Sequence, residues 1–304
     1  MIKSFLNYTG GKYRIMNQLI PLFPTQSDTM VDLFGGSGVV TLNYHRADRY
    51  IFNDNNKQLV DLIRFIDNNS TIFIEQSIDK IIRHYDLSNT MAFGYEFYKT
   101  SSSKGLAAIN KCGYMRLRTD YNNSLQFSNL GPLYLYALII FGFNNQIRFN
   151  KNGFFNNPVG KRDFNVNMRK KLHDFTYVWK KISPYVISKD FRDIEITKGD
   201  FVYADPPYSI ATATYNETGG WSAKDDQDLF HYLDKVDKKG AKFALSNVLE
   251  HKGKQNSKLL NWGNKYNINR ISNSFKNSNY HTKRSSSKEV LITNYETTIY
   301  RTNF

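Results

Sequence analysis

The eight residues Phe201 to Tyr208, Phe-Val-Tyr-Ala-Asp-Pro-Pro-Tyr, constrain the fold of this chain more than any other stretch. Residues 201–204 predict a short buried strand that stops at an acid and a rigid turn. In open α/β sheets, ligands bind at this carboxyl edge of the strands. The prolines carry no N–H, so the Asp205 carboxylate and the Pro206 carbonyl are two acceptors for a planar amine, and Tyr208 offers a ring for stacking. The alternative is an ordinary Pro-Pro turn after a strand.

A second segment has the order of a nucleotide-binding unit. A strand over residues 30–34 precedes Gly35-Gly-Ser-Gly38, and an apolar helix is expected over residues 39–44. The next strand, residues 49–54, ends at Asp54, in the position of an acid that commonly binds ribose hydroxyls. Thr41 stands where a dinucleotide fingerprint has its third glycine. That argues against a nicotinamide dehydrogenase and leaves a mononucleoside-like cofactor.

The remaining pattern alternates helices and strands, which predicts an α/β fold. Near the start, Gly10-Gly-Lys12 opens a helical stretch that Pro24 ends, although Gly-Gly-Lys alone is a weak signal. Further helices are expected over residues 58–66, 72–82, 132–143, 166–183 and 223–238, and further strands near Ile187 and Ile194 and over residues 242–246 and 289–294. A polar loop, residues 209–221, suits a mobile cover over a pocket.

The composition limits where the protein can be located in the cell and what kind of partner it binds. The 304 residues lack an apolar run of the roughly 20 residues that cross a bilayer, and the chain begins without a signal-peptide core. One cysteine, Cys112, fits a reducing cytosol. The net charge of +14 points to a polyanion, usually nucleic acid. Residues 251–288 contain no acid but nine lysines and arginines, which a solvated surface or an AT-rich genome would also explain.

The segment 144–162 is crowded with Asn, Gln, Arg and Lys and is predicted to form a hairpin and loop. These side chains read base edges and phosphates in nucleic-acid complexes. A polar surface hairpin is the alternative.

In order, the chain carries Tyr8-x-Gly-Gly-Lys12, Phe34-Gly-Gly-Ser-Gly38, Asn53-Asp54, Asp205-Pro-Pro-Tyr208 and Leu245-Ser-Asn247. This ordered set resembles the DNA adenine methylases of the alpha group, the D12 class of N6-adenine DNA methyltransferases. The likeness extends through residues 148–162 and 285–295 and so covers nearly the whole chain.

The resemblance implies a Rossmann-like S-adenosylmethionine-dependent methyltransferase sheet in residues 1–60 and 173–304. A mainly helical target-recognition domain carrying a β-hairpin is implied for residues 61–172. The implied cofactor-binding residues are Tyr8, Gly10, Gly11, Lys12, Asp32, Phe34, Gly35, Gly36, Ser37, Gly38, Asp54 and Asp205. Asp32 is expected to face the methionine part of the donor.

The implied chemistry places the target adenine, flipped out of duplex DNA, against Asp205, Pro206, Pro207 and Tyr208. Methyl transfer to the N6 amine would be direct and in line, with no metal. The implied DNA-binding residues are Asn7, Arg116, Arg118, Asn145, Arg148, Asn150, Lys151, Asn152, Pro158, Lys161 and Arg162.

Two positions depart from the family members that methylate GATC. Those members carry Lys where this chain has Asn7, and Arg or Lys where it has Asn152. Lys161 and Arg162 also replace an Arg-Tyr pair. Because long cationic side chains suit guanine, we predict a short palindromic target other than GATC, with CATG as the first candidate.

Three alternatives remain from the sequence: methylation of RNA adenine, methylation of a protein glutamine, and a catalytically silent DNA-binding module. Asp205, in place of the Asn of glutamine methylases, disfavours the second. The expected setting is a monomer in the cytoplasm of a bacterial cell, or a phage-encoded protein, within a restriction-modification system whose cognate endonuclease forms no stable complex with it.

Overall fold

The computed structural model describes residues 1–8, 10–210, 220–272 and 287–297, and the chain divides into two compact units. The first unit comprises Met1, Lys12–Asn55 and Ile187–Phe304, and the second comprises Ile2–Gly11 and Asn56–Val186. The predicted domains divide the chain at residues 60 and 172, whereas the units divide it at residues 55 and 186. Helix α7 (Val166–Ile182) therefore lies wholly in the second unit.

A mixed sheet organises the first unit, and the predicted α/β class is confirmed at this level. Its strand order is β3-β2-β1-β4-β5-β8-β7, with β6 beside β5. β1 pairs in parallel with β2 and β4, β4 pairs in parallel with β5, and β8 is antiparallel to both β5 and β7. The strands are β1 (Ser27–Asp32), β2 (Ala47–Asn53), β3 (Tyr185–Ile187), β4 (Phe201–Ala204), β5 (Lys242–His251), β6 (Lys254–Gln255), β7 (Asn267–Ile271) and β8 (Ser287–Thr293).

The direction of strand succession reverses between β1 and β4. From β1 the chain proceeds outward to β2, and from β4 it proceeds outward in the opposite direction to β5. Loops after two such strands leave in opposite directions, so a crevice forms at their carboxyl ends, where α/β sheets bind ligands. Asp32 ends β1 and Asp205 follows β4, so both acids lie at this point.

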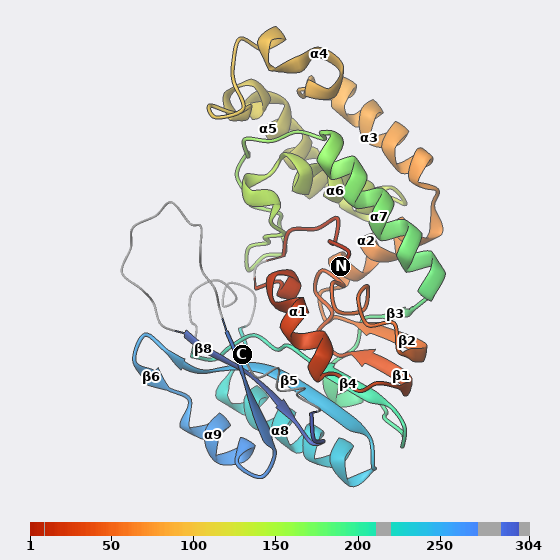
Figure 1. Cartoon of the computed structure of the whole chain (residues 1–304). Coiled ribbons are helices and arrows are strands. Elements are labelled where there is room, and N and C mark those ends of the chain that lie inside the picture. The colour runs from red at the N-terminus through yellow and green to blue at the C-terminus, as the bar shows by residue number, and fades with distance from the viewer. Residues whose placement is uncertain (9, 211–219, 273–286, 298–304) are drawn as a thin grey trace, which may run out of the picture. The chain divides into compact units, whose positions relative to one another are not determined.

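Strand β4 shows how the two faces of the sheet are covered. Phe201 and Tyr203 point to one face, where their rings contact Phe23 at 5.3 Å between centroids. Val202 and Ala204 point to the other face and join the core that contains Leu229 and Leu233 of α8 (Ala223–Lys238). Figure 1 shows α8 and α9 (Ser257–Gly263) on one side of the sheet and α1 (Met16–Leu19) on the other. The described part of this unit also contains the single-turn 3-10 helices Lys12–Ile15, Ile20–Leu22 and Phe191–Asp193.

The second unit is helical and is built around α6 (Gly131–Phe141). This helix is apolar on all sides and almost entirely buried, as expected of a central helix. It contacts α2 (Lys57–Asn68), α3 (Thr71–His84) and α5 (Ala107–Asn123). The N-terminal segment joins this core through Phe5, whose ring contacts Tyr136 and Phe175. α4 (Thr90–Phe97) and the 3-10 helices Leu125–Phe127 and Phe143–Asn145 complete the set.

Side-chain caps fix where several of these helices begin. Asn56, Ser70 and Asn165 each accept a hydrogen bond from a backbone N–H in the first turn of α2, α3 and α7. In the first unit, Ser222 and Asp225 form a capping box at the start of α8.

Two local predictions are wrong, and three elements were not predicted. Residues 39–43 form consecutive turns in place of the helix predicted over residues 39–44, because the Thr41 N–H donates to the Asp32 carboxylate and is lost to a helical ladder. Ile194 follows a 3-10 turn and lies outside any strand. Helix α9 and strands β6 and β7 were not expected. Residues 211–219 of the predicted pocket cover lie outside the described part of the chain, and within that part no helix is long and apolar enough to cross a membrane.

Candidate active site

Asp205 lies in a compact trio with Lys12 and Tyr208, all in the first unit. The Lys12 ammonium is 2.8 Å from Asp205 Oδ2 and donates to the Tyr208 hydroxyl oxygen at 2.8 Å. The Tyr208 hydroxyl donates to Asp205 Oδ1, also at 2.8 Å. Burial, and next the Asp205 charge, hold the pKa of Tyr208 well above its usual value, so this phenol remains a hydrogen-bond donor. The trio fixes both oxygens of Asp205 at the edge of the sheet, and the structure brings together three of the predicted site residues.

The glycine-rich turn after β1 is held against β2 by backbone bonds. The Gly35 N–H donates to the Asn53 carbonyl at 2.7 Å, and the Gly36 N–H donates to Asp54 Oδ2 at 2.9 Å. Gly36 and Gly38 have φ of +52° and +72°, a region that favours glycine. The predicted residues Gly35, Gly36, Gly38 and Asp54 therefore form one contiguous structure.

Gly35 has a packing role that the sequence did not suggest. A Cβ atom added there would lie 2.1 Å from the ring of the fully buried Phe52. The missing side chain thus admits the Phe52 ring of β2 beneath the turn.

Asp32 is buried, with 1% of its surface exposed, and turns its carboxylate to Thr41. The Thr41 hydroxyl and backbone N–H both donate to Asp32 Oδ2, at 2.7 and 3.3 Å. Burial raises the pKa of Asp32 to about 7, against the lowering effect of these bonds, and the charges of Asp205 and Asp54 add to the rise. Thr41, at the position of the absent third glycine, is therefore the partner of this acid.

An aromatic wall stands beside the glycine-rich turn. Phe34 contacts Phe191 and Trp221 at 5.5 Å between ring centroids. Trp221 is anchored by its indole N–H, which donates to Asp226 at 2.6 Å. Ser37 of the turn is buried. The wall offers an apolar surface for a flat ligand.

The remaining predicted cofactor residues, Tyr8, Gly10 and Gly11, belong to the second unit. The Gly11 N–H donates to the Tyr8 carbonyl at 3.0 Å, and Gly10 has φ +79°. This is a tight glycine turn. Their role stays a prediction.

The predicted recognition hairpin exists as two isolated antiparallel bridges, Gly142–Val159 and Phe149–Phe155. Its tip is a turn in which the Asn150 side chain accepts the N–H groups of Asn152 and Phe154, both at 3.0 Å. Asn150 therefore shapes the turn. Lys151 and Asn152 are exposed at the tip, and the Arg148 guanidinium donates to Asn156 at 2.8 Å.

The other predicted DNA-binding residues divide into structural and exposed ones. Asn145 donates to the Ile140 carbonyl at 2.6 Å and accepts from Asn7 at 3.2 Å, so these two positions are coupled. Arg118 is turned to the Asn157 carbonyl, whereas Arg116 forms an exposed ion pair with Asp86. The exposed residues beyond the hairpin tip are Pro158, Lys161 and Arg162.

Sequence reasoning missed the residues that anchor the hairpin on α5. Asn122 makes a reciprocal pair of bonds with the backbone of Phe155, and Tyr114 donates to the Asn157 carbonyl. The buried Asn157 in turn donates to the Phe143 and Gln146 carbonyls. In the first unit, the structural role of Asn53 was missed. Its side chain donates to the Leu33 and Lys189 carbonyls and accepts from the Lys189 N–H. The only available signal was an excess of Asn in loops.

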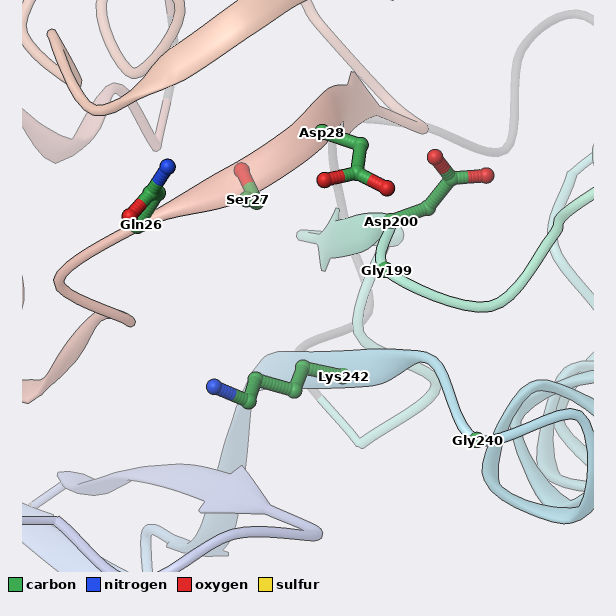
Figure 2. Close-up of a pocket in the computed structure, with 7 residues that line it drawn as sticks. All are labelled: Gln26, Ser27, Asp28, Gly199, Asp200, Gly240 and Lys242. Carbon is green, nitrogen blue, oxygen red and sulfur yellow. The ribbon is translucent and has the colours of Figure 1, made fainter.

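A shallow pocket of about 270 Å³ lies at the opposite edge of the sheet, around the amino ends of β1, β4 and β5. Figure 2 shows Asp28, Asp200 and Lys242 among its lining residues. The pocket contains none of the residues described above and has no part in the proposed chemistry.

Comparison with known proteins identifies the family of the chain. The sequence model of the D12 class N6 adenine-specific DNA methyltransferases matches residues 8–285. The chain is 36% identical over 307 residues to the modification methylase StsI of Streptococcus sanguinis and 37% identical over 303 residues to the type II methyltransferase M.FokI of Planomicrobium okeanokoites. Both alignments cover 97% of this chain but 43% of the relative, so the chain spans less than half the length of these proteins.

A shorter relative is matched over most of its own length. The DNA adenine methylase of Haemophilus influenzae is 28% identical over 219 residues, which cover 71% of this chain and 68% of that protein. The resemblance found in the motifs is confirmed by these matches. The chain belongs to the D12 class N6 adenine-specific DNA methyltransferase family.

Proposed function

We propose that this chain transfers a methyl group from S-adenosylmethionine to the N6 amine of adenine in a short duplex DNA site. The observation that carries the proposal is the Lys12–Asp205–Tyr208 trio at the carboxyl end of β4, beside the point where strand succession reverses. The finer fold assignment also belongs to this proposal: the first unit as a Rossmann-like methyltransferase domain and the second as the target-recognition domain.

The first unit fits the donor in charge and shape. S-adenosylmethionine carries a sulfonium and an ammonium, and when bound it supplies an electrophilic methyl group. The carboxylates Asp32, Asp54 and Asp205 surround the carboxyl ends of three neighbouring strands, with Lys12 as a cation bound to one of them. Glycines with positive φ in the adjoining turn leave room for a ligand, and Phe34 provides an apolar wall. An acid-rich site of this kind favours a cationic ligand.

The chain's own residues account for activation of the amine. The lone pair of an adenine amine is delocalised into the ring, so the amine is a weak nucleophile. When the Asp205 carboxylate and the Pro206 carbonyl accept hydrogen bonds from its two N–H groups, the nitrogen becomes more tetrahedral and its lone pair becomes available for attack. A C–N bond would then form as the C–S bond of the donor breaks, and the amine would release one proton. Tyr208 supports the ring of the flipped base by stacking and, through its hydroxyl, fixes Asp205. Positioning supplies most of the rate enhancement in such a displacement.

The target sequence and the biological setting are also part of the proposal. The exposed Asn152 at the hairpin tip and the Asn7–Asn145 contact support a site other than GATC, with CATG as the first candidate. The names of the longer relatives support a modification methylase of a restriction-modification system, in a bacterial cell or encoded by a phage.

Asp205→Ala tests the mechanism. We expect loss of methyl transfer by at least about 10³-fold, because the acceptor that reshapes the amine is removed, with DNA affinity changed by less than about threefold. Transfer is measured with radiolabelled donor on duplex DNA from a host that lacks DNA methylation, and binding by fluorescence anisotropy. Appreciable transfer by the variant would contradict the assigned role of Asp205.

Expression in the same unmethylated host tests the activity itself. Single-molecule sequencing of the host genome should show N6-methyladenine in one short motif, and that motif identifies the target. Modification of GATC alone would refute the predicted target. Absence of any modified base, with soluble protein present, would refute the activity and favour an RNA substrate or a silent binding module.

A further inference from the structure

Strand β5 is much longer than its neighbour β4 and extends beyond the site. Leu245 pairs with Ala204, the last residue of β4, and β5 continues for six more residues, 246–251, with a bulge between Val248 and Glu250. At about 3.3 Å per residue, the end of β5 lies roughly 20 Å past the edge that carries Asp205. Figure 1 shows β5 running away from α8 to its junction with β6.

The end of β5 is stiffened by strands on both sides. His251 pairs with Lys254 of β6 and with Ser287 of β8, and Glu250 pairs with Gln255 and Lys288 in the same manner. The His251 ring and the Ser287 hydroxyl share a hydrogen bond of 2.7 Å. We call this three-stranded extension, residues 248–255 and 287–289, the basic arm.

The tip of the basic arm presents two lysines to solvent. Glu250, the acid nearest the tip, forms an ion pair with Lys288 at 2.6 Å. Lys252 and Lys254 are exposed, and within the described residues neither one forms an ion pair with a carboxylate. The tip therefore carries two uncompensated positive charges.

The backbone at the tip gives an independent reason to regard Lys252 as functional. Lys252 and Gly253 form the two-residue turn between β5 and β6, with φ of +51° and +78°. Such type I′ turns place Asn, Asp or Gly at the first position, because a longer side chain is strained at positive φ. Among the residues that the structure describes, the Lys252 side chain forms no hydrogen bond or ion pair that would offset this strain. A lysine at positive φ costs conformational energy, and this strain at an exposed position supports a role for its charge.

We infer that the basic arm binds the phosphate backbone of the DNA that flanks the target adenine. The inference rests on the proposed function. An exposed ammonium on a stiff support binds phosphate as a point charge, and the net charge of +14 favours the same polyanion. With the duplex axis along β5, as the inference requires, a reach of up to about 20 Å corresponds to contacts at most roughly six base pairs from the flipped base, at 3.4 Å per base pair.

The test compares two double variants that remove the same charge from opposite ends of the first unit. Lys252→Asn with Lys254→Gln removes the charge of the arm, and asparagine suits the left-handed turn, so the fold is retained. Lys198→Gln with Lys242→Gln is the matched control, because both lysines are exposed and Lys242 begins the same strand β5 at the pocket of Figure 2. Thermal unfolding and donor binding of both variants check that the fold is intact.

Binding is measured by fluorescence anisotropy between 50 and 300 mM KCl on duplexes of 24 and 8 base pairs, each centred on the motif that is methylated in cells. For the arm variant on the long duplex we expect roughly tenfold weaker binding at 100 mM KCl. We also expect a log–log salt slope shallower by about 1.8, which is the loss of two phosphate contacts. On the short duplex, which ends before the arm, the variant should match the unaltered protein.

Two outcomes of these measurements would overturn the inference. Equal salt slopes for the arm variant and the unaltered protein would overturn the inference. So would an equal effect of the control pair, because only the global charge would then matter. If the unaltered protein transfers methyl groups to DNA while the arm variant binds normally, the inference alone fails. If the unaltered protein transfers none, the proposed function fails.

Discussion

Asp32 is a single buried residue that makes the stability of the protein depend on pH. Its carboxyl group is buried at the end of β1 with both contacts on Thr41, and burial raises its pKa from 3.8 to about 7. The folded state therefore holds a proton between about pH 4 and pH 7 that the unfolded chain has released. Because the folded state binds more protons in that range, this group lowers the stability of the protein as pH rises from about 4 to about 7.

We predict that Asp32→Asn is more stable than the unaltered protein at pH 8, and that this gain is much smaller at pH 5, closer to the unfolded-state pKa of 3.8. The amide oxygen still accepts the Thr41 hydroxyl, and the buried charge is gone. A shift of about three pKa units corresponds to a gain on the order of 4 kcal/mol at most. Urea unfolding at both pH values measures the difference.

Asp28→Asn is the matched control for that prediction. Asp28 is an exposed acid on the same strand, whereas Asp32 is buried. The change in stability between pH 5 and pH 8 should therefore be larger for Asp32→Asn than for this variant. A difference for Asp32→Asn that does not change with pH would contradict the buried, protonated state.

At the scale of elements, the glycine-rich turn is held by its fit against β2. Gly35 leaves space for the Phe52 ring, which is fully buried and unable to move away without displacing other core side chains. Gly35→Ala should destabilise the protein by about 2–3 kcal/mol, the typical cost of overpacking. Thermal or urea unfolding gives the value.

A second substitution separates overpacking from a lost ligand contact. Phe52→Leu makes room for the new methyl group, so Gly35→Ala with Phe52→Leu should be less destabilised than the sum of the two single variants. Additive losses would show that the Phe52 ring does not limit this position.

The sequence predicted an element correctly where the interactions that form it lie close together in the chain, and failed where they do not. Strand β4 and helix α8 have the predicted bounds, because the pattern that forms each of them lies within a few consecutive residues. The helix expected over residues 39–44 failed, because the bond from Thr41 to Asp32 spans nine residues and no local pattern reports it.

The same reasoning applies to the two sites. The acid of the Asp-Pro-Pro-Tyr turn and the glycine-rich turn could be placed at one sheet edge, since parallel strands share that edge. The direct contact of Lys12 with Asp205 and Tyr208 joins residues almost 200 positions apart and was not predicted. Likewise, the anchoring of the hairpin by Asn122 depends on tertiary packing of α5.

At the scale of the whole molecule, net charge and local ion pairs respond to salt in opposite directions. A charge of +14 repels itself, and this energy grows with the square of the charge, so salt should stabilise the fold by screening it. Exposed pairs such as Lys57–Asp61 and Lys170–Asp174 are weakened by the same screening, but each contributes only about 0.3–0.5 kcal/mol. We therefore expect self-repulsion to dominate.

We predict that raising KCl from 20 to 200 mM increases the midpoint of thermal unfolding by roughly 3 °C or more, while DNA affinity falls steeply over the same range. The Debye length shortens from about 20 Å to about 7 Å, so repulsion across the molecule is removed while contacts within a pair persist. The Lys198→Gln and Lys242→Gln variant, with two fewer charges, should show a smaller increase. A midpoint that falls with salt in both proteins would show that local ion pairs, and not net charge, determine the stability of the fold.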